Sequence, residues 1–349
     1  MMIVVNARFL SQNISGVQRY AIEISRQLKI LGYGVRFFAP NNLIHKELAD
    51  ELDVEIIGNL TGHLWEQYEL PRYLSKLRNP LLLNLCNTAP LFYKNNVVTL
   101  HDIAFERYPR TFSWKFRYAY QLAIPRIARS SKKLLTDSAF SKDEISAVYG
   151  VDRNKIDIVH CSVSGRFCFS EKETTEKYIL AVSSLNYQKN FHALIQAFNL
   201  LKDKNIKLYL VGAINKNFAD HKLVENIESN SNIKFMGRVN DDELVQLYSN
   251  ALCFVYPSLY EGFGIPPLEA QACGCPCVVS SAASLPEACA DSVVYCDPFD
   301  VSDMAKKIQL VVNDETLRGE LRAKGFENIK RFSWTKSAKQ IIQIIEGLQ

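Results

Sequence analysis

Residues 251–280 read ALCFVYPSLYEGFGIPPLEAQACGCPCVVS. The stretch begins with a short β-branched and aromatic run, which predicts a buried strand over 251–256. Pro266 and Pro267 then open a helix, because a proline at the first helical positions loses no intrahelical hydrogen bond. Gly274 ends that helix, and a second apolar run predicts a strand over 277–280. A strand, a helix and a strand in this order are typical of a parallel sheet covered by helices.

The same alternation of short apolar runs and longer stretches of helical period continues along the whole chain. It predicts an α/β protein with two doubly wound domains. At 349 residues the chain also exceeds the length at which a single core stops growing. The predicted strands are 3–6, 35–39, 54–57, 81–85, 96–100, 133–136 and 156–159 in the first half, and 178–183, 206–211, 233–236, 251–256, 277–280 and 292–295 in the second.

The boundary between the two domains is predicted at residues 170–177, a run of eight residues without an apolar side chain. It separates an N-terminal domain, residues 1–169, from a C-terminal domain, residues 178–331. Residues 332–349 end the chain, and apolar residues at helical spacing predict a helix over 335–348. We expect this helix to pack back on the N-terminal domain, with the C-terminal domain as the alternative.

The loop between the strand and the helix of the quoted stretch carries candidate chemistry. In open α/β sheets, ligands bind outside the carboxyl ends of the strands, where N–H groups at helix N-termini face an anion. Here Gly262 and Gly264 permit close approach of the backbone, and the carboxylates of Glu261 and Glu269 flank the loop. Two acceptor-only groups beside an anion site suit a ligand with hydroxyls near its phosphates. The alternative is that Glu269, in the first turn of the helix, complements the helix dipole and that Glu261 caps a turn.

The segment Glu261–Glu269 resembles the E-x7-E motif of retaining glycosyltransferases in the large glycosyltransferase family four. The resemblance runs over nearly the whole chain and implies the GT-B fold, in which two Rossmann-like domains face a central cleft. Its other landmarks, in the order expected, are Gly16-Val17-Gln18-Arg19-Tyr20, His101-Asp102, TDSAFSK at residues 136–142, Gln188-Lys189-Asn190, Gly237-Arg238-Val239 and Leu285-Pro286-Glu287.

The resemblance implies a donor site centred on this segment. Glu269 would hydrogen-bond the ribose of the nucleotide, and Glu261 would contact hydroxyls of the transferred sugar. Backbone N–H groups of the loop would assist. The residues of this segment expected to bind the donor are Gly262, Phe263, Gly264, Ile265 and Glu269.

Residues after other strands complete the implied site. Lys189 would bind the diphosphate and stabilise the leaving group, and His101 would lie near the donor sugar and the reacting centre. Gly16 would let the N-terminal loop approach the diphosphate, and Val239 would touch the base through its backbone. His101, Lys189 and Glu261 are therefore the expected catalytic residues. Taken singly, each has a structural alternative, such as a surface lysine, a plain turn or a histidine satisfied by packing.

One position departs from the family's pattern. Many members have an arginine about five residues before the phosphate-binding lysine, and Ser184 occupies that place here. Arg19 or Arg238 is the candidate for the second positive charge on the diphosphate.

The implied reaction transfers a hexosyl group, of mannose or rhamnose type, from a nucleoside diphosphate sugar to a saccharide acceptor with retention of configuration. A GDP-sugar is the favoured donor, and a UDP- or dTDP-sugar is the alternative. No cofactor is expected. No metal is expected either, because the chain contains no Asp-x-Asp motif. By analogy, the expected acceptor is a lipid-linked intermediate of a surface polysaccharide.

Two rival functions stay open on this scaffold, a sugar-nucleotide epimerase and a non-catalytic sugar-nucleotide-binding protein. A dinucleotide oxidoreductase is excluded, because no Gly-x-Gly-x-x-Gly lies between the first strand and the first helix.

Residues 104–133 form a basic stretch interleaved with aromatic side chains. It holds eight lysines and arginines against the single acid Glu106. Such a composition suits an anionic membrane surface or an acceptor that bears a diphosphate. The alternative is a half-buried helix whose aromatic residues belong to the core. Nucleic acid is not an expected partner, because no nucleic-acid-binding motif accompanies the charge.

Composition predicts a cytoplasmic protein, peripheral at most on the inner face of the cytoplasmic membrane. No apolar run reaches the length of about 18 residues needed to cross a bilayer, and the N-terminus lacks the pattern of a signal peptide. Nine cysteines fit a reducing compartment. The group Cys273, Cys275 and Cys277 lacks the spacing of a metal site, so we expect it to be structural.

Overall fold

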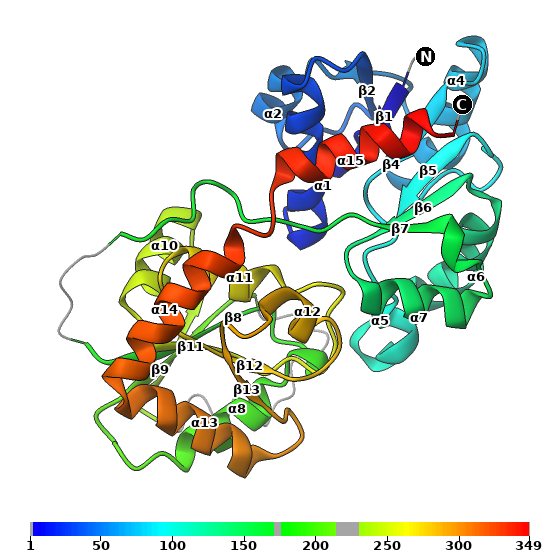
Figure 1. Ribbon diagram of the computed structural model, residues 1–349. Helices are drawn as coiled ribbons and strands as arrows, with labels where there is room; N and C mark the ends of the chain where they lie inside the picture. Colours follow the sequence, from blue (N-terminus) through cyan, green and yellow to red (C-terminus); the bar gives the residue numbers. More distant parts are fainter. Residues whose placement is uncertain (1–2, 171–175, 214–229, 349) are drawn as a thin grey trace. The chain divides into compact units, whose positions relative to one another are not determined.

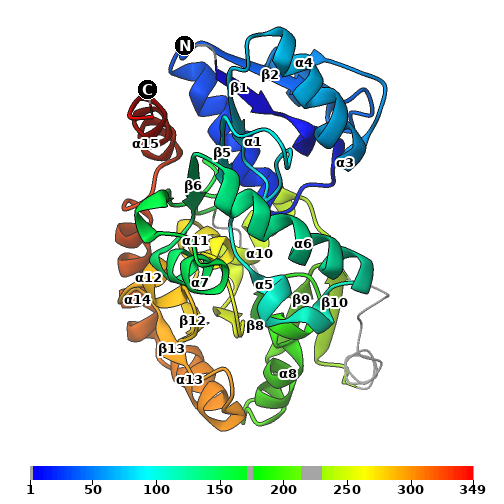
Figure 2. The same cartoon turned by 90° about the vertical axis from the view of Figure 1, so that its right-hand side faces the viewer.

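The computed structural model describes residues 3–170, 176–213 and 230–348. They form two compact units (Figures 1 and 2). The first unit runs to Cys161 and takes up the chain again from Ser333, and the second comprises Ser162–Phe332. All the strands predicted from the sequence are present, with ends that differ by at most two residues. The α/β fold class with two doubly wound sheets is confirmed.

The first unit contains a seven-stranded sheet in the order β3-β2-β1-β4-β5-β6-β7. Every strand pair in it is parallel, and Ile3 of β1 pairs with Val35 on one side and Leu81 on the other. The sheet therefore grows in opposite directions from β1 and β4. Its strands are β1 Ile3–Asn6, β2 Val35–Ala39, β3 Glu55–Ile56, β4 Leu81–Asn84, β5 Asn96–Thr99, β6 Lys133–Thr136 and β7 Ile156–Ile158.

Helices of the first unit connect these strands and cover the sheet. Helix α1 begins with a capping box, in which Ser15 and Gln18 satisfy each other's backbone N–H groups. Helix α7 is followed by Gly150, whose φ of 61° is the left-handed conformation that often terminates a helix. The helices are α1 Gly16–Ile30, α2 Lys46–Glu51, α3 Gly62–Leu64, α4 Leu70–Lys76, α5 Ala104–Arg107, α6 Trp114–Ser130 and α7 Ala139–Tyr149, and a π-helical turn covers Trp65–Glu69.

The last helix, α15 (Trp334–Glu346), lies in the first unit against α1, as Figure 1 shows. Its buried face carries Ala338, Ile341 and Ile345, at helical spacing. The ring of Trp334 meets that of Tyr20 edge-on at 5.8 Å. The sequence alone allowed this helix to pack on either domain. The structure shows that it packs on the N-terminal one, against α1.

The second unit contains a six-stranded parallel sheet in the order β10-β9-β8-β11-β12-β13. Its strands are β8 Tyr178–Val182, β9 Lys207–Val211, β10 Ile233–Gly237, β11 Cys253–Tyr256, β12 Cys277–Ser280 and β13 Val294–Cys296. Its helices include α8 Phe191–Asn199, α10 Asp241–Asn250, α11 Ile265–Ala272, α12 Leu285–Cys289, α13 Val301–Asn313 and α14 Glu315–Ile329. Helices α8 and α13 lie side by side in both views and share one apolar core with the sheet.

The units divide at Cys161, upstream of the linker predicted over residues 170–177. Residues 162–169 belong to the second unit because their aromatic side chains are anchored there. The ring of Phe167 lies 6.3 Å from Tyr248, and the guanidinium of Arg322 lies 5.2 Å from the ring of Phe169. Most of the predicted linker, residues 171–175, lies outside the described residues. In the described parts of the chain, no helix has the length and apolar character to cross a membrane.

Candidate active site

The order of the second sheet places β8 beside β11, where the direction of sheet growth reverses. Open α/β sheets bind ligands outside the carboxyl ends of the strands at this switch point. Lys189 ends the turn after β8, and Glu261 lies in the loop after β11. The fold therefore brings the ends of both segments to one place.

Lys189 and Glu261 meet directly. The Nζ atom of Lys189 lies 2.6 Å from Oε1 of Glu261, and the two side chains are only 14% and 12% exposed. The same Oε1 accepts hydrogen bonds from the hydroxyls of Tyr256, at 2.7 Å, and Ser258, at 2.6 Å. Two of the residues expected to be catalytic thus form one buried, hydrogen-bonded pair, which we call the switch-point pair.

Tyr256 stays a neutral donor to this carboxylate. Its burial, together with the charge of Glu261, raises the pKa of Tyr256 well above its ordinary value. The Lys189 ammonium also lies 5.7 Å from the centre of the Tyr256 ring, in cation–π range. Tyr256 therefore fixes both members of the pair.

Backbone contacts hold the two loops together beneath the switch-point pair. Asn190, in the left-handed conformation with φ of 60°, donates from Nδ2 to the carbonyls of Pro257, at 3.1 Å, and Pro298, at 2.7 Å. The N–H of Leu259 donates to the carbonyl of Gln188 at 2.8 Å. The loop after β8 thus supports the loop after β11, and the pair does not depend on long flexible segments.

Gly264 starts helix α11 in a conformation that requires glycine. Its φ is 106°, and a Cβ atom there would lie 2.5 Å from Cδ2 of Leu285. The sequence predicted Glu269 in the first turn of this helix, and this prediction is wrong. The helix begins at Ile265, so Glu269 is its fifth residue. Because dipole stabilisation fades beyond the first turn, it does not account for this carboxylate, which is 7% exposed.

The other donor residues expected in this segment line the start of α11. Gly262 and Phe263 are buried, and Ile265 is half-buried. The ring of Phe263 meets that of Phe332 edge-on at 5.2 Å. The loop backbone is therefore anchored by a side chain that points into the unit.

Val239 and Arg238 follow β10, Val239 half-buried and Arg238 exposed. Both line a pocket of about 540 Å³ beside β10 and α10. A hollow of about 660 Å³ lies elsewhere, along α14, where Lys324 contributes to its wall. Neither is lined by a member of the switch-point pair.

Ser184, which replaces the family's arginine, is exposed and accepts a hydrogen bond from Nδ2 of Asn186 at 3.2 Å. The two candidate substitutes belong to different units, Arg19 on α1 of the first and Arg238 after β10 of the second.

In the first unit, Gly16 opens α1 and is exposed. A Cβ atom on it would meet nothing within 4 Å, so packing does not explain the lack of a side chain there. Arg19 follows on the same helix and is half-buried.

His101 is 4% exposed at the carboxyl end of β5, and both of its ring nitrogens are bonded inside the first unit. Nδ1 lies 2.7 Å from Oδ2 of Asp137, and Nε2 lies 3.0 Å from the carbonyl of Leu85. Burial lowers the pKa of His101, but the charge of Asp137 and the bonds to Asp137 and Leu85 outweigh it, so the pKa is raised. Since a carboxylate and a carbonyl only accept, His101 is placed as a buried cation.

Cys273, Cys275 and Cys277 are buried free thiols. Cys275 and Cys277 are buried around the start of β12, and burial raises the pKa of each thiol well above its ordinary value. In the described parts of the chain, no group of three His, Cys, Asp or Glu side chains could hold a metal ion.

Sequence reasoning missed Tyr256 and Ser258, the two hydroxyls on Glu261. Both precede Glu261 by only a few residues, but Tyr256 ends an apolar strand and is indistinguishable there from a core residue.

Family models match both halves of the chain. Residues 167–331 match the model of glycosyl transferases group 1, and residues 14–164 match that of glycosyltransferase family 4. O-antigen chain mannosyltransferase B of Escherichia coli is 28% identical over 365 residues, covering 94% of this chain and 95% of that protein. O-antigen chain mannosyltransferase RfbU of Salmonella typhimurium is 32% identical over 244 residues, covering 69% of this chain and 67% of that protein.

Among solved structures, HepE of Anabaena in complex with UDP and glucose matches with a TM-score of 0.80. The sequences are 18% identical, and the match covers 99% of both chains. This likeness supports the fold, and the family models and relatives support the activity. The chain therefore belongs to glycosyltransferase family four and is a glycosyltransferase with the GT-B fold.

Proposed function

We propose that this glycosyltransferase moves a hexosyl group of mannose or rhamnose type from a nucleoside diphosphate sugar, with GDP favoured, to a lipid-linked polysaccharide intermediate. The observation that carries the proposal is the buried Lys189–Glu261 pair at the switch point of the second sheet. Two relatives named as O-antigen chain mannosyltransferases favour mannose and a surface polysaccharide. The complex of HepE with UDP keeps UDP as the alternative base, together with dTDP.

In the proposed reaction, the Lys189 ammonium leaves Glu261 and pairs with the diphosphate of the donor. A fixed cation in a site shielded from water stabilises the charge that develops on the leaving group. The Glu261 carboxylate, still held by Tyr256 and Ser258, then accepts hydrogen bonds from hydroxyls of the transferred sugar. The protein's task is positioning and charge stabilisation.

The remaining donor contacts follow from the same loops. Glu269, buried on α11, would accept hydrogen bonds from the ribose, and N–H groups of Phe263 and Gly264 at the start of this helix would face the donor. Val239 would touch the base through its backbone. Gly16 would admit the diphosphate to the first unit's loop, and Arg19 or Arg238 would supply the charge that Ser184 lacks.

We propose retention of configuration without a metal, with the departing phosphate accepting the proton of the acceptor hydroxyl. His101 contributes charge in this scheme, because both of its ring nitrogens are already bonded to Asp137 and Leu85. Its positive charge would stabilise the electron-rich leaving group rather than transfer a proton.

An anionic membrane surface is the proposed docking partner of α6. The structure separates apolar residues of the basic stretch into two sets. Phe112, Phe116 and Tyr120 pack against the core, whereas Trp114, Tyr118 and Leu122 are more than half exposed. The exposed three recur every fourth residue, so they form one apolar stripe.

Basic side chains accompany this stripe. Lys115 lies 5.6 Å from the Trp114 ring and Arg117 lies 5.1 Å from the Tyr118 ring, and Arg126 continues the stripe. A helix with exposed aromatic and cationic residues suits the headgroup region of an anionic leaflet. We therefore propose a peripheral position on the inner face of the cytoplasmic membrane, where a lipid-linked acceptor would be reached.

Nucleotide binding tests the proposal first. GDP, UDP and dTDP are compared by thermal shift, because a ligand at 100 times its dissociation constant stabilises the folded state by about 2.7 kcal/mol. A shift with at least one nucleotide is expected, and none with any of them contradicts the donor class. Formation of a product that joins the sugar of GDP-mannose to an acceptor then distinguishes a transferase from an epimerase, which isomerises the donor without an acceptor.

A further inference from the structure

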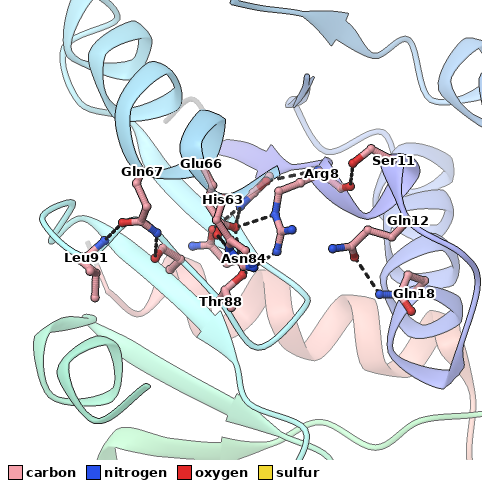
Figure 3. A network of polar contacts seen from close by, with 12 residues as sticks. Arg8, Ser11, Gln12, Gln18, His63, Glu66, Gln67, Asn84, Thr88 and Leu91 are labelled. Carbon is pink, nitrogen blue, oxygen red and sulfur yellow. Dashed lines mark hydrogen bonds and ion pairs between the residues drawn. The ribbon is translucent and has the colours of Figure 1, made fainter. Parts of the chain in front are cut away.

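A second cluster of buried polar side chains lies at the switch point of the first sheet, between β1 and β4 (Figure 3). Asn6 and Asn84 are the last residues of these strands, and Arg8 and Thr88 follow them. Glu66 joins them from the π-helical turn Trp65–Glu69. The cluster thus holds the same topological position in the first unit that the switch-point pair holds in the second, which is where open α/β sheets bind ligands.

Glu66 is the centre of the cluster. Its Oε1 accepts hydrogen bonds from Asn6 Nδ2, at 2.8 Å, Thr88 Oγ1, at 3.1 Å, and Arg8 Nε, at 3.2 Å. Nη2 of Arg8 donates to Thr88 Oγ1 at 2.9 Å, and Asn6 Nδ2 also donates to Asn84 Oδ1 at 3.0 Å. Three side chains therefore bond one carboxylate oxygen, and Asn84 holds one of the three, Asn6, in place.

The charges of the cluster cancel. The side chains of Arg8 and Glu66 are 7% and 1% exposed. Burial raises the pKa of Glu66, but the charge of Arg8 and the hydrogen bonds from His63 and Asn6 outweigh it, so the pKa is lowered and the carboxylate is ionised. A buried ion pair adds little stability over apolar residues of the same volume, so stability alone does not account for this one.

The support of Glu66 is rigid. π-Helical turns are rare and occur frequently at functional sites. Gln67, on the same turn, is tied to the loop after β4, since its Nε2 donates to the carbonyl of Ala89 at 3.0 Å and its Oε1 accepts from the N–H of Leu91 at 2.9 Å (Figure 3). The segment that carries His63 and Glu66 is therefore held in place by the loop after β4.

His63 connects the cluster to the surface. Its Nδ1 lies 3.2 Å from the second carboxylate oxygen of Glu66, and its side chain is 55% exposed. Because a carboxylate only accepts, the contact selects the tautomer with the hydrogen on Nδ1, and in this tautomer the lone pair of Nε2 is an acceptor. Among the residues that the structure describes, none forms a hydrogen bond with Nε2 of His63. Glu66 thus orients the imidazole of His63, whose Nε2 is left as a hydrogen-bond acceptor.

The surroundings of His63 suit a sugar rather than an anion. With Arg8 neutralised by Glu66, the cluster offers no excess positive charge. Leu64 and Tyr68, from the same segment of the chain, are 60% and 67% exposed, and apolar side chains of this kind suit the C–H face of a sugar ring. A cavity of about 10 Å³ beside Arg8 and Thr88 has room for about one water molecule or hydroxyl oxygen.

We propose that His63, oriented by the buried Glu66, accepts a hydrogen bond from a hydroxyl of the acceptor saccharide and so positions the acceptor on the first unit. The ligand class is a neutral polyhydroxyl compound. The inference rests on the proposed glycosyl transfer, and it adds the acceptor-side residues to the donor-side pair. Glu66 is a positioning residue, because it acts through His63.

The test compares His63→Ala with the wild type in three measurements: nucleotide affinity, hydrolysis of the donor without acceptor, and transfer to methyl α-mannoside, methyl α-rhamnoside or methyl α-glucoside. Loss of one hydrogen bond should raise the KM for the sugar that the wild type uses by about three- to tenfold. Nucleotide affinity, donor hydrolysis and kcat at saturating acceptor should change less than about twofold.

His45→Ala is the matched control, because the ring of His45 forms a hydrogen bond with the carbonyl of Gln12 and lies outside the cluster. It should leave the acceptor KM unchanged.

Glu66→Gln keeps the shape of the side chain but leaves the charge of Arg8 buried without a counter-charge, so its folding is checked by thermal unfolding. If it folds, it should raise the acceptor KM as His63→Ala does. An unchanged acceptor KM in His63→Ala overturns the inference and leaves the proposed function intact, as does an equal loss of donor hydrolysis and transfer. Failure of the wild type to use any of the three sugars while it still hydrolyses the donor contradicts a neutral saccharide at this site. Failure to bind any nucleotide contradicts the proposed function instead.

Discussion

The Nζ atom of Lys189 lies 2.6 Å from Oε1 of Glu261, although 72 residues separate the two in the sequence. They meet because β8 and β11 are neighbours in the sheet and each is followed by one of the two side chains. Each neutralises the other in a largely buried setting. When a donor diphosphate binds, Lys189 would therefore exchange its anionic partner Glu261 for the diphosphate. The Lys189 ammonium is already largely shielded from water, so this exchange would cost little desolvation of the ammonium.

Lys189→Ala should lower the rate of glycosyl transfer by about 10²–10³-fold, the effect of removing one preorganised electrostatic contact to a leaving group. Lys189→Arg should recover part of the rate, because it keeps the charge. Initial rates with the identified donor measure both. The matched control is Lys324→Ala, since Lys324 is half exposed and pairs with Asp291 away from the site. A loss below about threefold in Lys189→Ala would contradict its role.

Glu269→Gln and Glu261→Gln should separate affinity from turnover. Glu269→Gln should weaken nucleotide binding by about tenfold or more, because a hydrogen bond to a charged group contributes about 1.5–3 kcal/mol. Glu261→Gln should lower kcat more than nucleotide affinity, because Glu261 is proposed to contact the sugar. Calorimetric titration with the nucleotide and steady-state rates measure the split. Small and equal effects in both variants would tell against the assigned roles.

Gly264→Ala should destabilise the second unit by about 1–3 kcal/mol, because an added Cβ combines a left-handed backbone with crowding against Leu285. Gly319→Ala is the control. Gly319 is exposed on α14, and a Cβ there meets nothing within 4 Å, so helix propensity should leave stability equal or raise it by up to about 1 kcal/mol. Thermal or urea unfolding measures both variants. Equal midpoints for the two would contradict the strain assigned to Gly264.

The His101–Asp137 contact should make stability depend on pH. The pKa of His101 is raised in the folded state, so the proton is bound more tightly there than in the unfolded chain. The contribution of His101 is therefore fully present below its unfolded pKa of about 6.5 and is lost as pH rises through the folded pKa. Urea unfolding from pH 6 to pH 9 should show this loss in the wild type and not in His101→Gln. Parallel curves for the two proteins would refute it.

Trp114→Ala combined with Tyr118→Ala should weaken binding to vesicles that contain anionic lipid, because it removes two aromatic groups from the exposed stripe of α6. Co-sedimentation with and without anionic lipid, at low and high salt, measures the binding. Phe299→Ala is the control, since Phe299 is 76% exposed in the second unit. Equal binding of the double variant and the wild type would exclude α6 as the membrane contact.

The sequence alone predicted every strand within the described residues, because many strands of these parallel sheets are buried and form continuous apolar runs that local pattern reveals. It also predicted that Lys189 and Glu261 belong to one site, but only through a resemblance. The local sequence pattern could not predict that the first unit ends at Cys161. The aromatic anchors Phe167 and Phe169 stand in an irregular segment, and only their contacts with Tyr248 and Arg322 show to which unit they belong.

What the sequence by itself determined is therefore the alternation of strands and helices and the family. Only the tertiary structure decided which polar side chains meet. Tyr256 and Ser258 share Glu261 Oε1, and Arg8 lies against Glu66, 58 residues away in the sequence. The physical reason is that strand and helix patterns are set by burial along one segment, whereas a hydrogen-bonded site depends on the order of strands in a sheet.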